Sequence, residues 1–393
     1  PGKKQEGLAF DIVNEDFIPY TFHYNAETLT TKNGHLLQII KINNFRGKDP
    51  HHNMGRATLR DFIRSAIKDS IKTDEFAFWI HTVRRKANLK DLLKTDHPKL
   101  TQLNDAWNAH NAFDVQFENE LYVTIIVKGV EFKTTDVAKK YFTHAKLKAA
   151  FEEGSHSKYT QLEEVSQKLL SSLSNYYTKK LKIVERDGVY YSEILEFLNK
   201  ILNLNDESVL ADEVDASSFL SSSEIGLGLN KMSIRNSLSS HSISVLTLKQ
   251  YVEVKPDLID DLLSLPFEFI IYQAFDYINP SEANEKFLVQ QKMLRVSNDY
   301  KMSKFLGFEE NEFEEAEAQT EKSKLRYGES QISIIIIADG EKDIESETKR
   351  FVDIISKIGF VVVRDDVNIE DSFFGSLPGN FSFLRRMQPI KTE

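Results

Sequence analysis

The sequence contains no cysteine. Disulfide bonds and thiolate metal sites are therefore excluded, and the fold depends on its hydrophobic core. Long apolar segments are absent too. The two longest apolar runs, Ile332–Ala338 (interrupted by Ser333) and Phe360–Val363, have the length of strands and are far shorter than a membrane-spanning helix.

Positive charge is also scarce relative to negative charge. The chain has 50 Lys and Arg residues against 60 Asp and Glu residues, which gives a formal net charge of −10. Proteins that bind nucleic acid through its phosphates need a clustered basic surface, so no specific nucleic-acid partner is expected. At 393 residues, with 41% hydrophobic and 28% charged residues, the composition is typical of a globular protein with two or three domains.

Familiar catalytic motifs are missing as well. The sequence has no Gly-x-x-x-x-Gly-Lys-[Ser/Thr] phosphate loop, no Gly-x-Gly-x-x-Gly and no His-Glu-x-x-His. The segment Gly226–Lys231 lacks the spacing of a phosphate loop, and we interpret it as a hairpin loop. We therefore predict that these residues hold no catalytic site, no cofactor site and no metal site.

The hydrophobic pattern predicts an α+β fold made of two ferredoxin-like antiparallel sheet/helix units in tandem, with a helical insertion between them. The first unit spans residues 1–134, and Asn33-Gly34 predicts a hairpin between its first two strands. Its predicted elements are strands at 18–24, 36–42, 76–83 and 121–127 and a helix at 58–71.

Residues 135–242 are predicted to form a helical connector followed by a serine-rich loop that carries a hairpin. Leucine and valine recur at helical spacing in this region, which favours helix as far as Lys182. Asp187-Gly188 then predicts a turn, and Ser192 is expected to cap a helix that ends at Leu202.

The second α+β unit is predicted to span residues 243–372, and residues 373–393 are predicted to be a linker to a further, C-terminal domain. The predicted elements of the second unit are strands at 243–254, 267–277, 331–338 and 360–364 and helices at 256–263, 281–326 and 341–358.

Two clusters of charge are candidate interaction sites. Arg84, Arg85 and Lys86 form a basic corner, which is either a salt-bridge cluster or a contact with anionic lipid or a neighbouring subunit. An acidic run is either a solvated helix face or a docking strip for a basic partner. Its candidate residues are Glu309, Glu310, Glu314 and Glu315. The aromatic residues Phe76, Phe78 and Trp79 are further candidates for a surface contact, although the alternation of side chains buries half of their strand.

The turn formed by Leu377, Pro378, Gly379 and Asn380 is a candidate inter-domain hinge. Proline presets its own φ and glycine allows a positive φ, so together they turn the chain through a fixed angle. We interpret this turn as the exit from one domain towards another.

Four segments together resemble the N-terminal, non-catalytic half of the VirB/TrbE/CagE-type ATPase of type IV secretion systems. Each is similar to a segment of that family, and they follow one another in the same order. The segments are Pro19–His23 with Thr31–Gln38, Phe76–Arg85, Asp187–Leu198 and Phe373–Asn380.

The resemblance implies an assembly and docking domain at the cytoplasmic face of the inner membrane. Its expected partners are other inner-membrane secretion subunits and neighbouring ATPase protomers, with peripheral membrane contact and oligomerisation as further expectations. Family members continue into a RecA-like domain with a phosphate loop, so ATP and Mg²⁺ are implied only for that domain. The alternatives are a stand-alone enzyme with an unrecognised pocket and a DNA-binding scaffold, which the net charge of −10 disfavours.

Overall fold

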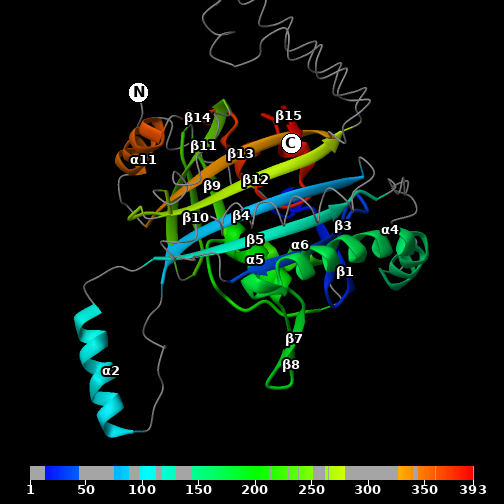
Figure 1. Ribbon diagram of the computed structural model, residues 1–393, viewed down its shortest axis with the longest axis horizontal. Helices are drawn as coiled ribbons and strands as arrows, with labels where there is room; N and C mark the ends of the chain where they lie inside the picture. The colour runs from blue at the N-terminus through cyan, green and yellow to red at the C-terminus, as the bar shows by residue number, and fades with distance from the viewer. Residues whose placement is uncertain are drawn as a thin grey trace, which may run out of the picture.

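The structure of the chain is a computed structural model that describes residues 14–43, 75–87, 97–111, 117–129, 144–212, 215–228, 230–237, 239–250, 262–263, 265–278, 326–339, 344–358 and 360–392. Within these residues, thirteen strands form one sheet and two further strands form a separate hairpin. Figure 1 shows the large sheet crossing the molecule with helices on both of its sides.

The strands from the first part of the chain lie in the order β1-β2-β3-β5-β4. They are β1 (Tyr20–Asn25), β2 (Thr28–Thr31), β3 (Leu36–Ile42), β4 (Phe76–Lys86) and β5 (Phe117–Val127). The short strand β6 (Thr178–Lys180) pairs with the end of β3. Gly34 has a φ of 77°, so the turn between β2 and β3 uses the left-handed conformation that glycine adopts without steric cost.

The strands from the second part continue the same sheet in the order β12-β13-β11-β10-β9. They are β9 (Glu224–Leu227), β10 (Met232–Arg235), β11 (Ser240–Gln250), β12 (Glu268–Ile278) and β13 (Arg326–Asp339). Two shorter strands, β14 (Val361–Arg364) and β15 (Gln388–Thr392), pair with β11 and with the start of β13. The two parts meet where β4 pairs with β12, from Arg84 opposite Phe269 to Ala77 opposite Asp276.

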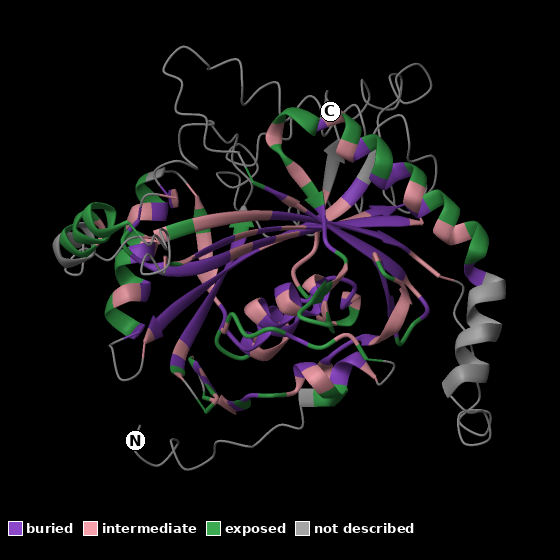
Figure 2. Cartoon of the chain, turned by 90° about the horizontal axis from the view of Figure 1, so that it is seen from below, coloured by how far each residue is buried: buried purple, intermediate pink, exposed green. Residues whose placement is uncertain are grey.

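One face of the sheet is covered by two long helices. Because successive side chains of a strand point to opposite faces, each strand contributes alternate residues to each face. Helix α4 (His144–Ser172) packs over β3, β4 and β5, and α11 (Ile344–Ile358) packs over β11, β12 and β13. Figure 2 shows that the strands of the large sheet, which these helices cover, are mostly buried.

The other face carries the largest hydrophobic core. It is covered by α5 (Glu193–Leu202), α6 (Ala216–Leu220) and α12 (Ile369–Phe374), with the short 3₁₀ helices η3 (Asn14–Phe17) and η6 (Phe381–Phe383) packed at its edge. The remaining elements are α2 (Pro98–Asn111), η5 (Ser174–Tyr176) and the hairpin of β7 (Ile183–Arg186) and β8 (Val189–Ser192), which projects from the body in Figure 1.

The predicted α+β class with an antiparallel sheet is confirmed. The two predicted units are parts of one sheet, because β4 and β12 pair with each other. The boundaries proposed between units stay a prediction. Ser192 caps α5 as expected, since its hydroxyl accepts from the backbone N–H of Leu195 at 3.1 Å. The serine-rich segment carries the hairpin of β9 and β10.

Three details of the prediction were wrong. The strands predicted at 18–24 and 36–42 do not pair with each other, because β2 lies between them. Residues 178–180 are not helical but form β6, which finds hydrogen-bond partners on β3. Residue 326 begins β13 instead of ending a helix. The helix predicted at 58–71 and most of those at 256–263 and 281–326 lie outside the described residues.

Candidate functional site

The segment of residues 372–380, which we call the anchor, lies against the sheet face that carries the largest core. Four of its backbone carbonyls accept hydrogen bonds from buried side chains of β1, β4 and β12. The pairs are Tyr20 Oη to Pro378 O at 3.0 Å, Trp79 Nε1 to Gly375 O at 3.1 Å, His81 Nε2 with Ser376 O at 2.7 Å and Tyr272 Oη to Ser372 O at 2.6 Å.

The predicted hinge lies inside this anchor. Leu377 is fully buried, and Gly379 has a φ of 89°, which a residue with a Cβ adopts only under strain. The side-chain amide of Asn380 donates to the carbonyls of Phe17 at 3.1 Å and Phe374 at 3.0 Å. The rings of Phe17 and Phe374 stack at 4.7 Å. The turn is therefore held in a single conformation by the core; its role as an inter-domain hinge stays a prediction.

A ring of hydrogen bonds continues from the anchor to the last strand. Tyr272 Oη donates to the Ser372 carbonyl and accepts from Gln331 Nε2 at 3.2 Å. Gln331 Oε1 accepts from the backbone N–H of Arg386 at 2.8 Å, and Arg386 Nε donates to Asp365 Oδ1 at 2.8 Å. Ser372 Oγ closes the ring by donating to Asp365 Oδ2 at 2.7 Å. The ring links α12, β12, β13 and the approach to β15.

The Asp365 carboxylate is fully buried, and Arg386 is the cation that faces it. Thr247 on β11 also donates its hydroxyl hydrogen to Asp365 Oδ2. A buried carboxylate is tolerated only where charge and hydrogen bonds replace its water. The chain that follows the anchor is thereby tied back to the sheet.

His81 is a neutral histidine in the centre of this contact. Burial lowers its pKa to about 4, although its hydrogen bond with Ser376 O acts in the opposite direction. Since a carbonyl oxygen can only accept, Nε2 carries the hydrogen of the neutral ring. His35 behaves in the same way: burial and the charge of Lys128 lower its pKa to about 4.

The basic corner begins with an arginine that points into the protein. Arg84 is 6% exposed. Its Nε donates to the Leu265 carbonyl at 2.7 Å, its Nη1 donates to Asn119 Oδ1 at 2.9 Å, and its guanidinium lies 4.5 Å from the centre of the Phe117 ring. These contacts join β4 and β5 to the segment before β12.

The other two cations of the corner are paired within the chain as well. Arg85 Nε donates to Glu268 Oε1 at 3.0 Å, and both of its terminal nitrogens donate to the Leu204 carbonyl at 3.1 Å. Lys86 forms an ion pair with Asp339. The corner therefore takes part in a salt-bridge cluster, and a contact of these residues with lipid or a subunit stays a prediction.

The other predicted surface residues have different outcomes. Glu309, Glu310, Glu314 and Glu315 lie outside the described residues. Phe76, Phe78 and Trp79 are buried on the two faces of β4, so the suggestion that they form a surface contact was wrong. Their alternation places Trp79 against the anchor and the two phenylalanines under α4, because both faces of this central strand are covered.

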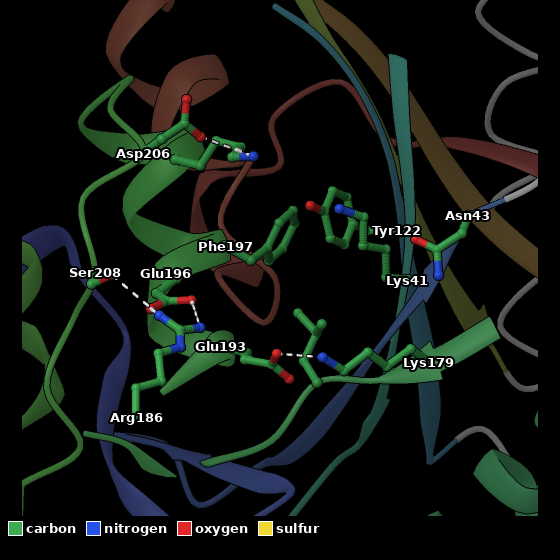
Figure 3. A pocket seen from close by; sticks show the side chains of 12 residues that line it. Lys41, Asn43, Tyr122, Lys179, Arg186, Glu193, Glu196, Phe197, Asp206 and Ser208 are labelled. Atoms are coloured by element: carbon green, nitrogen blue, oxygen red, sulfur yellow. Dashed lines mark hydrogen bonds and ion pairs between the residues drawn. The ribbon is translucent and has the colours of Figure 1, made fainter. Parts of the chain in front are cut away.

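A polar pocket of about 380 Å³ lies between α5, β3, β6 and the hairpin of β7 and β8 (Figure 3). Tyr122 and Phe197 line it with rings whose centres are 4.2 Å apart. Four cations and three carboxylates also line it. They are Lys41, Lys179, Arg186 and Lys200, and Glu193, Glu196 and Asp206.

Each of these cations has a carboxylate partner. Lys41 and Lys200 both pair with Glu120, and Lys200 also pairs with Asp206 at 2.9 Å. Lys179 pairs with Glu193, and Figure 3 shows that pair and the two-point pairing of Arg186 with Glu196, at 2.7 and 3.0 Å. A phosphate group would have to displace these carboxylates, so the pocket is poorly suited to a nucleotide.

Glu120 is the centre of the pocket's charge network. Burial alone would raise the pKa of its carboxyl group, but the ammonium groups of Lys200 and Lys41 lower that pKa below its ordinary value. Among the described residues, no group of three or more histidine, aspartate or glutamate side chains could hold a metal ion. No helix among them has both the length and the apolar character needed to cross a membrane.

Comparison with known families decides the class of the chain. Residues 179–386, which include the hairpin, the pocket helix α5 and the anchor, match the family model described as "CagE, TrbE, VirB family, component of type IV transporter system". The chain belongs to this family. Residues 27–135 match a second model, "Type IV secretion system ATPase VirB4/TrbE, N-terminal domain".

Individual relatives agree with this assignment. The chain is 24% identical over 384 residues to the type IV secretion system protein virB4 of Bartonella quintana, with 96% of this chain and 48% of the relative covered. It is 22% identical to protein virB4 of Rhizobium radiobacter, with 96% and 47% covered, and 20% identical to virB4 of Brucella suis, with 94% and 44% covered. The chain thus spans about half the length of these curated relatives.

The sequence alone did not point to the residues that hold the anchor. Tyr20, His81 and Tyr272 are far from it in sequence, and nothing in their spacing connects them with it. One signal was available for the ring: Gln331 and Ser333 are polar residues on one face of the otherwise apolar strand predicted at 331–338. Polar residues at core positions indicate a buried hydrogen-bond network.

The low pKa of His81 predicts a loss of stability in mild acid. Because the folded pKa of about 4 lies below the ordinary value of 6.5, the unfolded chain takes up the proton first as pH falls. The free energy of unfolding should fall between pH 6.5 and 4, by up to about 3 kcal/mol from this residue. Urea unfolding at several pH values measures this.

A His81→Gln variant keeps an N–H that can reach the Ser376 carbonyl but does not titrate. It should show a shallower pH dependence over the same interval, with the remaining slope due to other groups such as His35. His156→Gln, at an exposed position of α4, is the control and should leave the slope unchanged. An unchanged slope in the His81 variant would contradict the assignment.

The ion pair of Arg386 with Asp365 should be strongly coupled. Arg386→Met leaves a buried carboxylate without its cation and should lower the free energy of unfolding by roughly 3 kcal/mol. Asp365→Asn in the same chain should recover part of this loss. Arg385→Met is the matched control: its ion pair with Asp371 is 57% exposed on the arginine side, so its loss should cost less than about 1 kcal/mol. Arg386 is itself 36% exposed, so the expected difference comes from the burial of Asp365, and equal losses for both arginines would contradict this role of the buried carboxylate.

Proposed function

We propose that this chain is the assembly and docking half of a type IV secretion ATPase and that hydrolysis takes place in another part of the protein. The observation that carries the proposal is the pair of family matches, which together cover residues 27–135 and 179–386. The sequence has no phosphate-loop motif, and the relatives are about twice as long as the chain. ATP and Mg²⁺ would belong to the part of the relatives that this chain does not match.

The character of the structure supports a scaffold. In the anchor and the Asp365 ring, buried polar groups form hydrogen bonds that fix the backbone. The cations of the pocket are paired with carboxylates of the same chain. A catalytic site needs ionisable groups that remain available to a substrate. The proposed location of the chain is the cytoplasmic face of the inner membrane, where it would contact other secretion subunits and neighbouring copies of the ATPase.

The proposal predicts no ATP hydrolysis by the purified chain with Mg²⁺, above the rate of the same sample after heat denaturation. A full-length virB4 relative purified in the same way is the positive control. Turnover that follows the chain through successive purification steps would contradict the proposal.

Docking is tested separately in the bacterium. The chain should sediment with the inner membrane when the other secretion subunits are present and should leave it when their genes are deleted. Sedimentation that does not depend on those genes would refute docking through the subunits.

A further inference from the structure

Several side chains of the hairpin of β7 and β8 lie on the same one of its two faces. Tyr191 lies opposite Val184 on β7 and opposite Leu210 in an isolated bridge on the other edge of β8. Side chains of directly opposed residues lie on the same face, and so do those two residues apart in a strand. Val189 and Arg186 therefore belong to this face too. We call it the hairpin face.

Apart from Arg186, the hairpin face is apolar, and it is open to solvent. Val189 is 42% exposed and Leu210 is 46% exposed, and Val184 and Tyr191 are partly exposed beside them. Single exposed apolar side chains are common on protein surfaces, but neighbouring ones on a projecting element indicate a contact with a partner. Figure 1 shows that this hairpin extends away from the sheet.

The charges around the hairpin face are mostly negative. Lys182 and Arg186 are the exposed cations of the hairpin, and Arg186 is neutralised by Glu196. The exposed carboxylates of the hairpin and of the 206–212 segment are Glu185, Asp187, Asp206, Glu207 and Asp212, of which Asp206 pairs with Lys200 at 2.9 Å. A partner that carries lysine or arginine beside its apolar residues would be attracted to this rim.

The polar pocket adjoins the same face. Arg186 lines the pocket and also lies over the Tyr191 ring, 5.3 Å from its centre. The hairpin face therefore borders the polar pocket, in which the cations are already paired with carboxylates. A bound segment could place a polar side chain there without meeting an unpaired charge.

We propose that the hairpin face binds a polypeptide segment of another secretion subunit, one with apolar residues flanked by lysine or arginine. This rests on the proposed function and names the surface that carries it. A second copy of the chain is a poor occupant, because a symmetric contact would bring the carboxylates of the two rims together. An anionic membrane would be repelled by the same charge.

The test is site-specific photo-crosslinking in a bacterium that has a type IV secretion system. The full chain replaces the corresponding region of that bacterium's own secretion ATPase. A benzophenone amino acid is placed at Val189 or at Leu210. Val361 on β14 is the control position, because it has the same exposure of 42%. The expected result is a crosslink from 189 and 210, absent from 361, to an apolar segment of a different secretion subunit with adjacent lysine or arginine residues.

Charge reversal provides the second readout. Asp187→Lys with Asp212→Lys should lower the yield of the crosslink by at least about fivefold, because the steering charge is inverted. Glu224→Lys with Asp353→Lys, at exposed positions of β9 and α11, reverses the same number of charges and is the matched control, which should change the yield by less than about twofold. An equal loss in both variants would overturn the role of the rim.

The other outcomes also overturn the proposal. A product with the mass of two copies would identify the face as a self-contact, an adduct to lipid would identify it as a membrane contact, and no product at either position would leave the face without a partner. None of these results depends on hydrolysis or on sedimentation, so this surface can fail while the proposed function stands.

Discussion

The structure depends on one set of hydrogen bonds, in which side chains from the middle of the sheet satisfy the backbone of the anchor. Trp79 and His81 extend from β4 and Tyr272 extends from β12, so the two strands that join the halves of the sheet also hold residues 372–376. A buried carbonyl without a partner costs about 1–3 kcal/mol. If the anchor separated from this face of the sheet, several of these hydrogen bonds would be lost at once.

The Asp365 ring extends this constraint to the end of the described chain. Because Arg386 is bound both through its backbone to Gln331 and through its side chain to Asp365, β15 is aligned with β13 by a polar contact as well as by strand pairing. Under the proposed function, the half that docks would hold its last strand at a fixed position relative to the sheet.

Much of the fold could be predicted from the sequence, because periodicity and turn residues act locally. The strands later seen as β3, β4, β12 and β13 and the cap at Ser192 all follow from short patterns. The Leu377–Asn380 turn was also recognised, but only as an exit from a domain. Its burial could not be predicted, since Tyr20 and Phe17 contact it across more than 350 residues. The basic corner shows the same limit: the sequence reveals three consecutive cations, and only the tertiary structure reveals their partners.

Hydrogen–deuterium exchange of the anchor tests the central claim most directly. The amides of Gly375, Ser376 and Leu377 donate to carbonyls of α12, and that of Asn380 donates to Leu377. If the anchor is part of the core, these amides should exchange only when the whole sheet unfolds, as slowly as the amides in the middle of β4 and β13. Exchange many times faster than that of the sheet, with the sheet still protected, would show a loosely attached linker and would contradict the account.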